Sequence, residues 1–576
     1  MKKIMIFLAL YALICITACK KEYDMPVITA PGNTTVEVSK SVDLSFSFVA
    51  DGGYKSSSVT ATGGTATVKT APSANSKNGN IVVTFTAGSV TGAGSVVLTI
   101  VDNESQSQSA TAVLSIFEEG APAVTNPATS EVVVMQSVDI TFPFTAEGGY
   151  KSSNLTVTGG TAVIKTDGVA GATSGNVIVT YTAARASGAG SVIITITDNN
   201  NKSGQGTAVV NVLAFPTISV TENIAENTTW ETGKVYILEG RISVLSGVTL
   251  TIEPGVVIKG REGSGANATA LLIARGGKLM AEGTAESPII FTSIADEILP
   301  GEIISPNLEP TVSGLWGGLL VLGKAPISAA SDAMQIEGIP ASDLNGLYGG
   351  TEATDNSGVL KYISIRHGGA NIGEGNEING LTLGGVGSGT TIENIEIVAN
   401  DDDGIEWFGG TVNVKNAVVW NVGDDAIDTD QSWGGTLDNF IVINPGDECL
   451  ELDGPEGTMV AKHIIKNGTV YAGNAQGLVD LDDDNIPSDS YVDIDSVYFF
   501  GLKVGQDFDS VPTYYPCTFS NLEATLPAGT TLEQFFKDGS SAFTTAVKAG
   551  ENTVGADASV FAGWSWTAVS GSLNGF

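Results

Sequence analysis

The chain has few basic residues for its size. Its 576 residues include 27 Lys and Arg against 63 Asp and Glu, which gives a formal net charge of −36 and a pI of about 4.2. A surface this acidic repels phosphate groups, so the composition argues against nucleic acid and an anionic membrane surface as partners. It suits solubility, cation binding and neutral ligands.

Cysteine is equally scarce. Only Cys15, Cys19, Cys449 and Cys517 occur, and the first two fall in an N-terminal leader. The other two indicate neither a disulfide framework nor a cysteine-based metal site. Cys449 stands beside Leu450 at an apolar strand position, which favours a buried free thiol. A bridge between Cys449 and Cys517 is the alternative, and the sequence does not decide between them.

Long helical patterns are also lacking. Aromatic residues make up 7% of the chain, there are 71 glycines, and Val, Ile and Thr recur in short runs. This composition predicts an all-β protein. A chain of this length is too long for one core, so we expect several domains.

The N-terminus has the features of a targeting leader. Two lysines precede an apolar run over residues 4–16 that is too short to span a bilayer. The run ends in Ile16-Thr17-Ala18-Cys19, which resembles the lipobox of bacterial lipoproteins. The resemblance implies a lipoprotein signal peptide at residues 1–19 and a lipid-modified Cys19 that anchors the protein in the outer membrane. An ordinary signal peptide with an incidental cysteine is the alternative.

A short linker, residues 20–27, follows the leader. Its first residues, Lys20-Lys21-Glu22-Tyr23-Asp24, place acids just after the anchor. This order resembles the export signal of surface lipoproteins in the Bacteroidota. The resemblance implies that the protein faces the cell exterior, with the periplasm as the alternative.

A tandem repeat with a constant offset of 96 residues comes next. Ser41-Val42-Asp43-Leu44-Ser45-Phe46 returns as Ser137-Val138-Asp139-Ile140-Thr141-Phe142. Each copy holds about seven short alternating runs separated by turns, which predicts two β-sandwiches of immunoglobulin-like kind at 28–119 and 120–214. We interpret them as a stalk. A binding module with Tyr54 and Tyr150 as contacts is the competing interpretation.

Residues 215–505 contain short apolar runs at intervals in the low twenties. This period fits the rungs of a parallel β-helix, interrupted by two longer excursions at 294–313 and 325–357. Asn394, Asn416 and Asn439 recur at intervals of 22 and 23 residues, which predicts a ladder of stacked amides. The register resembles the right-handed parallel β-helix of the pectate-lyase-like superfamily over roughly residues 235–500.

The tail, residues 506–576, is expected to form a C-terminal cap. Thr530-Thr531-Leu532-Glu533 matches a capping box, which predicts a short helix through Phe536. We expect this helix and the hydrophobic segment 561–566 to cover one open end of the solenoid.

Three acidic phrases recur inside the β-helix segment. Asp402-Asp403-Gly404-Ile405-Glu406 returns as Asp424-Asp425-Ala426-Ile427-Asp428 and as Asp447-Glu448-Cys449-Leu450-Glu451. Parallel strands lie about 4.8 Å apart, so we expect these acids to stack in columns. Between Asp401 and Asp453 there are 13 acidic residues and one basic residue, Lys415. We call the stacked acids the acidic ladder.

Three interpretations of the acidic ladder remain open. The first is a Ca²⁺ site, because hard cations take several carboxylate oxygens; its ligands would be Asp402, Asp403, Asp424, Asp425, Asp447 and Glu448. The second is a polysaccharide-degrading enzyme, and the third is a solvated face with no ligand.

The enzyme interpretation rests on a resemblance to the paired acidic motifs of polygalacturonases. It implies that Asp403, Asp424 and Asp425 act as general acid and base. The family's Gly-His-Gly rung is replaced here by Asp447-Glu448-Cys449, and its Arg-x-Lys is not visible. A Ca²⁺-dependent lyase would need a basic residue, for which Lys415 is the only local candidate.

Tryptophans accompany the ladder and suggest a sugar platform, because rings stack on the C–H faces of pyranoses. The glycan contacts predicted on this basis are Glu406, Trp407, Asp428, Trp433 and Glu451. Alternation of strand side chains also allows these tryptophans to point into the core. We expect His367 to lie at a turn and His463 to flank a strand.

The leading hypothesis is a monomeric lipoprotein that binds glycan or another cell-surface ligand without catalysis, with Ca²⁺ as its cation. The alternatives are the enzyme and an adhesive spacer. An enzyme would need its carboxylates at the floor of a groove roofed by the two excursions.

Overall fold

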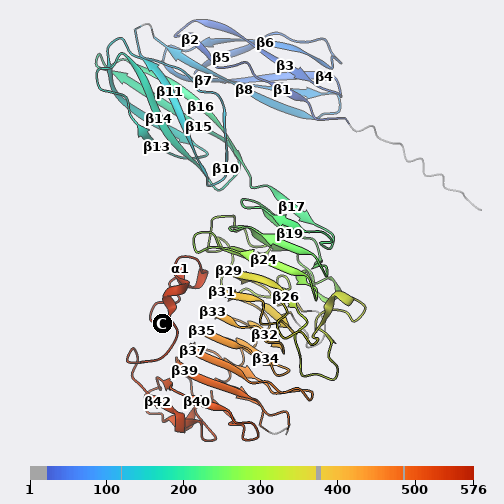
Figure 1. Ribbon diagram of the computed structural model, residues 1–576. Coiled ribbons are helices and arrows are strands. Elements are labelled where there is room, and N and C mark those ends of the chain that lie inside the picture. Colours follow the sequence, from blue (N-terminus) through green and yellow to red (C-terminus); the bar gives the residue numbers. More distant parts are fainter. Residues whose placement is uncertain (1–22, 119, 372–377, 484–486) are drawn as a thin grey trace, which may run out of the picture. The chain divides into compact units, whose positions relative to one another are not determined.

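The computed structural model describes residues 23–118, 120–371, 378–483 and 487–576 (Figure 1). The predicted signal peptide and Cys19 lie outside the described residues. The chain divides into two compact units, Met1–Ala214 and Phe215–Phe576. Among the described residues, no helix has the length and apolar character needed to cross a membrane.

The first unit holds two β-sandwiches, as the repeat predicts. The strands of the first are β1 (Val27–Thr29), β3 (Ser41–Val49), β6 (Asn78–Ala87) and β5 (Gly64–Thr70) in one sheet, and β2 (Thr34–Glu37), β8 (Ser107–Phe117), β7 (Gly92–Asp102) and β4 (Tyr54–Thr62) in the other. The strands of the second are β9 (Ala123–Val124), β11 (Ser137–Thr145), β14 (Ser174–Ala183) and β13 (Gly160–Thr166), facing β10 (Ser130–Val133), β16 (Ser203–Leu213), β15 (Gly188–Asp198) and β12 (Tyr150–Thr158).

Side chains alternate along these strands between core and solvent. Phe46 on β3 and its repeat partner Phe142 on β11 are both fully buried. Tyr54 and Tyr150 are also buried, so neither presents a ring to a ligand. Alternation places one face of each strand in the apolar core, which is why the repeated sequence builds the same sandwich twice.

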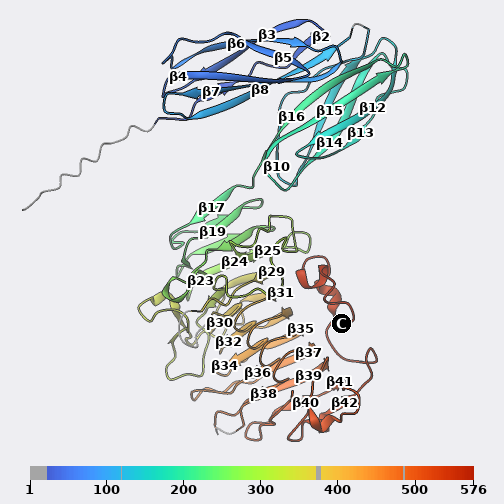
Figure 2. The ribbon, with the colours of Figure 1, turned by 180° about the vertical axis from the view of Figure 1, so that it is seen from behind.

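The second unit is a solenoid of parallel strands in two sheets (Figures 1 and 2). The long sheet contains β17 (Thr217–Val220), β18 (Thr228–Trp230), β19 (Val235–Leu238), β21 (Thr249–Ile252), β22 (Val257–Gly260), β24 (Lys278–Glu282), β25 (Ile289–Ser293), β29 (Gly358–Arg366), β31 (Thr391–Val398), β33 (Val414–Trp420), β35 (Thr436–Ile443), β37 (His463–Tyr471), β39 (Val492–Phe500), β40 (Thr518–Ser520), β41 (Leu522–Ala524) and β42 (Thr544–Ala546). The short-stranded sheet contains β20 (Arg241–Val244), β23 (Ala270–Ile273), β26 (Leu319–Leu322), β30 (Leu381–Gly384), β32 (Ile405–Phe408), β34 (Ile427–Asp430), β36 (Glu451–Leu452) and β38 (Asp480–Leu481). A hairpin, β27 (Met334–Gln335) with β28 (Leu347–Tyr348), and the helical turns η1 (Gly265–Asn267), η2 (Leu344–Gly346), η3 (Leu532–Gln534), η4 (Ser540–Phe543), η5 (Ala558–Phe561) and α1 (Trp566–Val569) complete the unit.

The expected amide ladder is present at the bend of the long sheet. Asn416 donates from Nδ2 to Oδ1 of Asn394, and Asn439 donates in the same way to Asn416, both at 2.8 Å. All three residues have a positive φ near 60°, a conformation that asparagine tolerates better than most residues. A second ladder, in which Asn444 donates to Asn421 at 3.0 Å, was not predicted.

The tail does not cap the solenoid as a single piece. Phe535 and Phe536, at the end of η3, join the main core, whereas Trp564 and Trp566 pack against the outer face of the long sheet beside Val418 and Trp420. Figure 1 accordingly shows α1 beside β29 and β31, away from β42. The expectation that segment 561–566 covers an open end is therefore wrong.

A buried ion pair fixes the tail on this face. Thr567 donates from its backbone N–H and its hydroxyl to Oε1 of Glu396, at 2.8 and 2.7 Å. Glu396 in turn pairs with Arg366 at 3.5 Å, and both side chains have no exposed surface.

The capping box is also one residue later than predicted, between Thr531 and Gln534, and it opens a single 3₁₀ turn. The apolar outward residues Val418 and Trp420 indicate that some segment covers this face. The covering segment can come from anywhere in the chain, so the sequence pattern alone could not identify the tail as that partner.

We predict that Trp564→Ala releases the tail. Removal of a fully buried indole costs about 3–5 kcal/mol of packing, and the indole of Trp564 belongs to the apolar cluster that holds the tail on the sheet. Limited proteolysis should therefore cut the variant near residues 545–576 faster than the wild type. The control is Val569→Ala, whose side chain is 44% exposed. Equal cleavage of Trp564→Ala and wild type would contradict this role of the tail.

Candidate functional site

The acids of the ladder stack in register on the short-stranded sheet. Glu406 pairs with Asp428, Asp428 with Glu451, and Glu451 with Asp480, on the consecutive strands β32, β34, β36 and β38. These strands follow one another down the solenoid in Figure 2. The predicted stacking of the acidic phrases is thus present in the fold.

A second column lies just before these strands. The carboxylate of Asp403 accepts the backbone N–H of Asp425 at 3.0 Å, and the carboxylate of Asp425 accepts the backbone N–H of Glu448 at 2.5 Å. Each carboxylate therefore links its own rung to the next one. This use of Asp403 and Asp425 is structural, whatever else they do.

Three buried carboxyl groups converge where the two columns meet. Asp403, Glu406 and Asp428 each offer an oxygen atom that lies within 4.8 Å of the other two. Their exposed fractions are 7%, 4% and 8%. We call these three residues the acidic triad.

Burial and mutual repulsion oppose ionisation of the acidic triad. Burial is the first cause that raises the pKa of all three groups well above the ordinary range. The second cause is a neighbouring carboxylate, Asp402 for Asp403, Asp428 for Glu406 and Asp403 for Asp428. Burial, together with a hydrogen bond to Glu451, also raises the pKa of Asp425 to about 11. At neutral pH such a cluster must hold either protons or a cation.

On the long sheet, stacked charges of opposite sign are adjacent. Lys361, Glu393, Lys415, Asp438, Lys466 and Asp495 occupy one outward position on six successive rungs. Signs alternate along this column, and Lys361 pairs with Glu393 at 3.1 Å while Lys466 pairs with Asp438 at 3.5 Å. The same chain thus neutralises a stack of charges on one sheet and leaves the other stack without a base.

The rung before the acidic triad supplies a neutral oxygen. Asn379 is 1% exposed and donates from Nδ2 to Glu406, while its Oδ1 is a buried atom without a hydrogen-bond partner. The three carboxyl groups of the triad are an all-oxygen set, which is the donor type that Ca²⁺ prefers. The residues present therefore fit a hard divalent cation.

Asn379 was missed by sequence reasoning, although a signal exists. Asn379-Gly380-Leu381-Thr382 occupies the same rung position as Asp403-Gly404-Ile405-Glu406, because Leu381 pairs with Ile405 and Thr382 with Glu406. The phrase is thus the neutral first member of the acidic series. A search for acids alone passes over it.

The structure brings together only some of the predicted metal ligands. Within the described residues, the two groups of three acids are the triad and the set Asp402, Asp403 and Asp424. Asp425, Asp447 and Glu448 belong to neither group.

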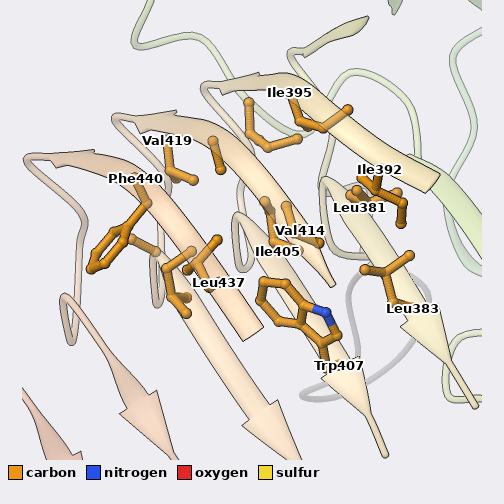
Figure 3. Close-up of a cluster of buried hydrophobic side chains, with 14 of the residues drawn as sticks. Leu381, Leu383, Ile392, Ile395, Ile405, Trp407, Val414, Val419, Leu437 and Phe440 are labelled. Carbon is orange, nitrogen blue, oxygen red and sulfur yellow. The ribbon is translucent and has the colours of Figure 1, made fainter. Parts of the chain in front are cut away.

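The predicted sugar platform is wrong. Trp407 and Trp433 have no exposed surface and stack on each other in the solenoid core, with ring centroids 4.6 Å apart. Figure 3 shows Trp407 among Leu383, Ile405 and other core side chains. Strand alternation is the cause, because Trp407 is two residues from the inward-facing Ile405.

Lys415 cannot serve the acidic ladder as a base. It lies on β33 of the long sheet, in register with Glu393 and Asp438, whereas the ladder belongs to the short-stranded sheet. His367 sits at a turn with a φ of 58°, as expected, and His463 begins β37. Both histidines are buried. Cys449 and Cys517 are free thiols.

The excursion at 325–357 folds over the outer face of the short-stranded sheet. Ile327, Ile336 and Tyr348 pack with Leu320 and Phe408 in one buried cluster. Tyr348 also donates to Oε1 of Gln431 at 3.0 Å. The excursion at 294–313 lies farther along the rung, where Ser313 contacts Asp401 at 2.7 Å. The enzyme interpretation requires the two excursions to roof a groove, whereas 325–357 packs its side chains directly against the sheet.

Family comparison agrees with this architecture. The family described as the pectate-lyase like beta helix domain matches residues 222–510. The chain belongs to this family. Membership suggests a carbohydrate-related role and leaves open whether the β-helix binds or cleaves. No curated protein matches the chain.

Solved structures resemble the chain over about a third of its length. The titin domains z1z2 in complex with telethonin match at 14% identity and a TM-score of 0.15, covering 34% of this chain and 98% of theirs. The D0-D1 domain of intimin matches at 14% identity and a TM-score of 0.22, covering 32% and 98%. The sialic acid binding region of a Streptococcus sanguinis adhesin matches at 8% identity and a TM-score of 0.13, covering 36% and 82%. Scores this low carry no argument about what this chain binds.

We predict that Asp453→Asn stabilises the β-helix at pH 8. Burial, then the neighbouring Asp482 and Asp430, raises the pKa of Asp453 to about 8. The native state therefore holds this proton above the pH at which the unfolded chain loses it, and stability falls as pH rises from about 4 to 8. The gain from the substitution at pH 8 should be about 1 kcal/mol or more, because one pKa unit corresponds to about 1.4 kcal/mol.

The measurement is urea unfolding at pH 5 and pH 8 in a buffer with chelator. The variant should show a smaller loss of stability between the two pH values than the wild type does. Glu551→Gln, a change at an exposed carboxylate, serves as control. A variant with the same pH dependence as the wild type would contradict the prediction.

Proposed function

We propose that the protein is a lipid-anchored, surface-exposed protein of the outer membrane whose β-helix binds glycan without cleaving it, with Ca²⁺ held in the acidic ladder. The observation that carries the cation proposal is the acidic triad: three buried carboxyl groups within 4.8 Å of one another and no basic side chain among them. Asp403, Glu406 and Asp428, with Oδ1 of Asn379, would hold the ion. The bound ion would supply the positive charge that the ladder lacks.

Three features favour binding over cleavage. Asp403 and Asp425, the predicted acid and base, are buried and already accept backbone hydrogen bonds from the next rung. The local basic candidate, Lys415, lies on the other sheet. The third rung reads Asp447-Glu448-Cys449, without a histidine.

The glycan part of the proposal is supported by the family. A pectate-lyase like β-helix domain suggests a carbohydrate-related role, and an acidic chain of net charge −36 favours uncharged ligands over polyanions. The anchoring part is supported by the lipobox-like Ile16-Thr17-Ala18-Cys19 and by the acids that follow it.

The cation is tested by calorimetric titration of the chelator-treated protein with CaCl₂. We expect one site in the wild type, and loss of that site in the double variant Glu406→Gln/Asp428→Asn, because two of the charged ligands are gone. Glu393→Gln is the matched control, since Glu393 lies in the charge-alternating column of the long sheet. Unchanged Ca²⁺ binding by the double variant would refute the site.

Catalysis is tested on the same preparations with a reducing-sugar assay on polysaccharides, with and without Ca²⁺. We expect no release of reducing ends. Release that disappears in Asp403→Asn/Asp425→Asn would establish the enzyme instead.

The anchor is tested by metabolic labelling with a radioactive fatty acid in a bacterial host. The wild type should take up label and fractionate with membranes, and Cys19→Ser should do neither, because only the cysteine thiol can receive the lipid. Cys15→Ser is the matched control. Labelling that survives Cys19→Ser would refute the assignment.

A further inference from the structure

A polar groove crosses the outer face of the long sheet, away from the acidic ladder. It has a volume of about 430 Å³ and is lined by hydroxyls and amides of β31, β33, β35 and the residues just before them, including Thr390, Asn413 and Thr436. A second groove of about 360 Å³ adjoins it and shares Lys415 and Asp438. The two grooves meet at these two residues, and the second extends towards Asn439 and Asp557.

Lys415 stands at the junction of the two grooves. Its neighbours in the column, Glu393 and Asp438, are paired with the outer lysines Lys361 and Lys466. Lys415 itself is exposed and has neither an ion pair nor a hydrogen bond in the part of the chain that the structure describes. It is thus the ammonium of this column that remains available to a ligand.

An aromatic platform lies farther along the same face. Tyr491 and Tyr515 stack with ring centroids 5.2 Å apart, and Tyr514 meets Tyr515 edge-on at 4.8 Å. Tyr514 is 50% exposed. Lys462 covers the Tyr491 ring at 5.0 Å and also pairs with Asp493 on the outer side of β39.

The platform is displaced from Lys415 both along the axis and across the rungs. Tyr491 immediately precedes Val492, and the pairing of β33 with β35, β37 and β39 places it three rungs beyond Lys415 and four residues before Asp495, the residue in register with Lys415. Three rung spacings correspond to about 14 Å along the axis. The grooves and the tyrosines together therefore span more than a single sugar.

We propose that this strip, from the Lys415 groove to the Tyr514 platform, binds an uncharged oligosaccharide laid obliquely across the rungs of the solenoid. Hydroxyl and amide groups in the groove exchange hydrogen bonds with sugar hydroxyls, Lys415 donates to sugar oxygens, and the tyrosine rings pack against C–H faces. Most positive charges of the strip are paired with carboxylates, so the strip has no excess of positive charge that would favour a polyanion. This inference rests on the proposed glycan binding and assigns it a place that the acidic ladder does not provide.

The test is binding of uncharged hexasaccharides (cellohexaose, mannohexaose, maltohexaose and laminarihexaose), the matching disaccharides and hexagalacturonate, measured by calorimetry on the full chain. At least one uncharged hexasaccharide should bind, and its disaccharide should bind much more weakly because it cannot reach both ends of the strip. Lys415→Ala and Tyr514→Ala should each weaken binding at least about fivefold. Tyr514→Phe keeps the ring and should retain most of the affinity.

Lys278→Ala, at an exposed lysine of β24 outside the grooves, is the matched control. All substituted side chains are exposed, so thermal melts should confirm that every variant folds. Hexasaccharide binding that survives both Lys415→Ala and Tyr514→Ala would overturn the strip and leave glycan binding standing. Preference for hexagalacturonate would overturn the ligand class. Absence of binding by every saccharide would overturn both the strip and the proposed glycan function.

Discussion

Each residue of a parallel β-helix lies about 4.8 Å from the residue at the same position of the next rung. A charged side chain on the surface therefore interacts directly with the side chains at the same position of the two adjacent rungs. At the bend of the long sheet the stacked side chains are neutral, and each asparagine donates a hydrogen bond to the asparagine of the rung before it. On the outer face of the same sheet, lysine alternates with glutamate or aspartate from rung to rung, so opposite charges are adjacent.

The acidic ladder departs from both solutions. Asp403 and Asp425 relieve part of the repulsion by accepting backbone N–H groups of the next rung. The triad contains no basic side chain, and burial makes its charged form still less favourable. This cluster without a base, in a chain whose long sheet alternates its charges, is the physical reason to propose a cation for the ladder.

The buried tryptophans separate cation binding from carbohydrate stacking, two roles that the sequence places on the same strands. Trp407 and Trp433 stabilise the solenoid from inside, so the acids beside them are not accompanied by an aromatic platform. An aromatic surface is instead formed by Tyr491, Tyr514 and Tyr515 beside the start of β39 in the long sheet. Lys415 and the hydroxyls of the groove lie on earlier rungs of the same sheet. The two proposals, cation binding and glycan binding, therefore concern different faces of the β-helix.

The sequence by itself determined whatever depends on local period. The repeat offset of 96 residues predicted paired sandwiches, and the intervals of 22 and 23 residues predicted the β-helix. The recurring asparagines predicted their ladder, because residues separated by one rung length stack on one another. Tertiary structure alone decided which face each residue serves and what covers it. The burial of the triad beside Asn379, the tail held by Glu396, and the separation of Lys415 from the ladder all depend on contacts between residues far apart in the chain. No local pattern encodes such contacts, since side-chain direction changes with a shift of one residue and the covering segment can come from anywhere in the chain.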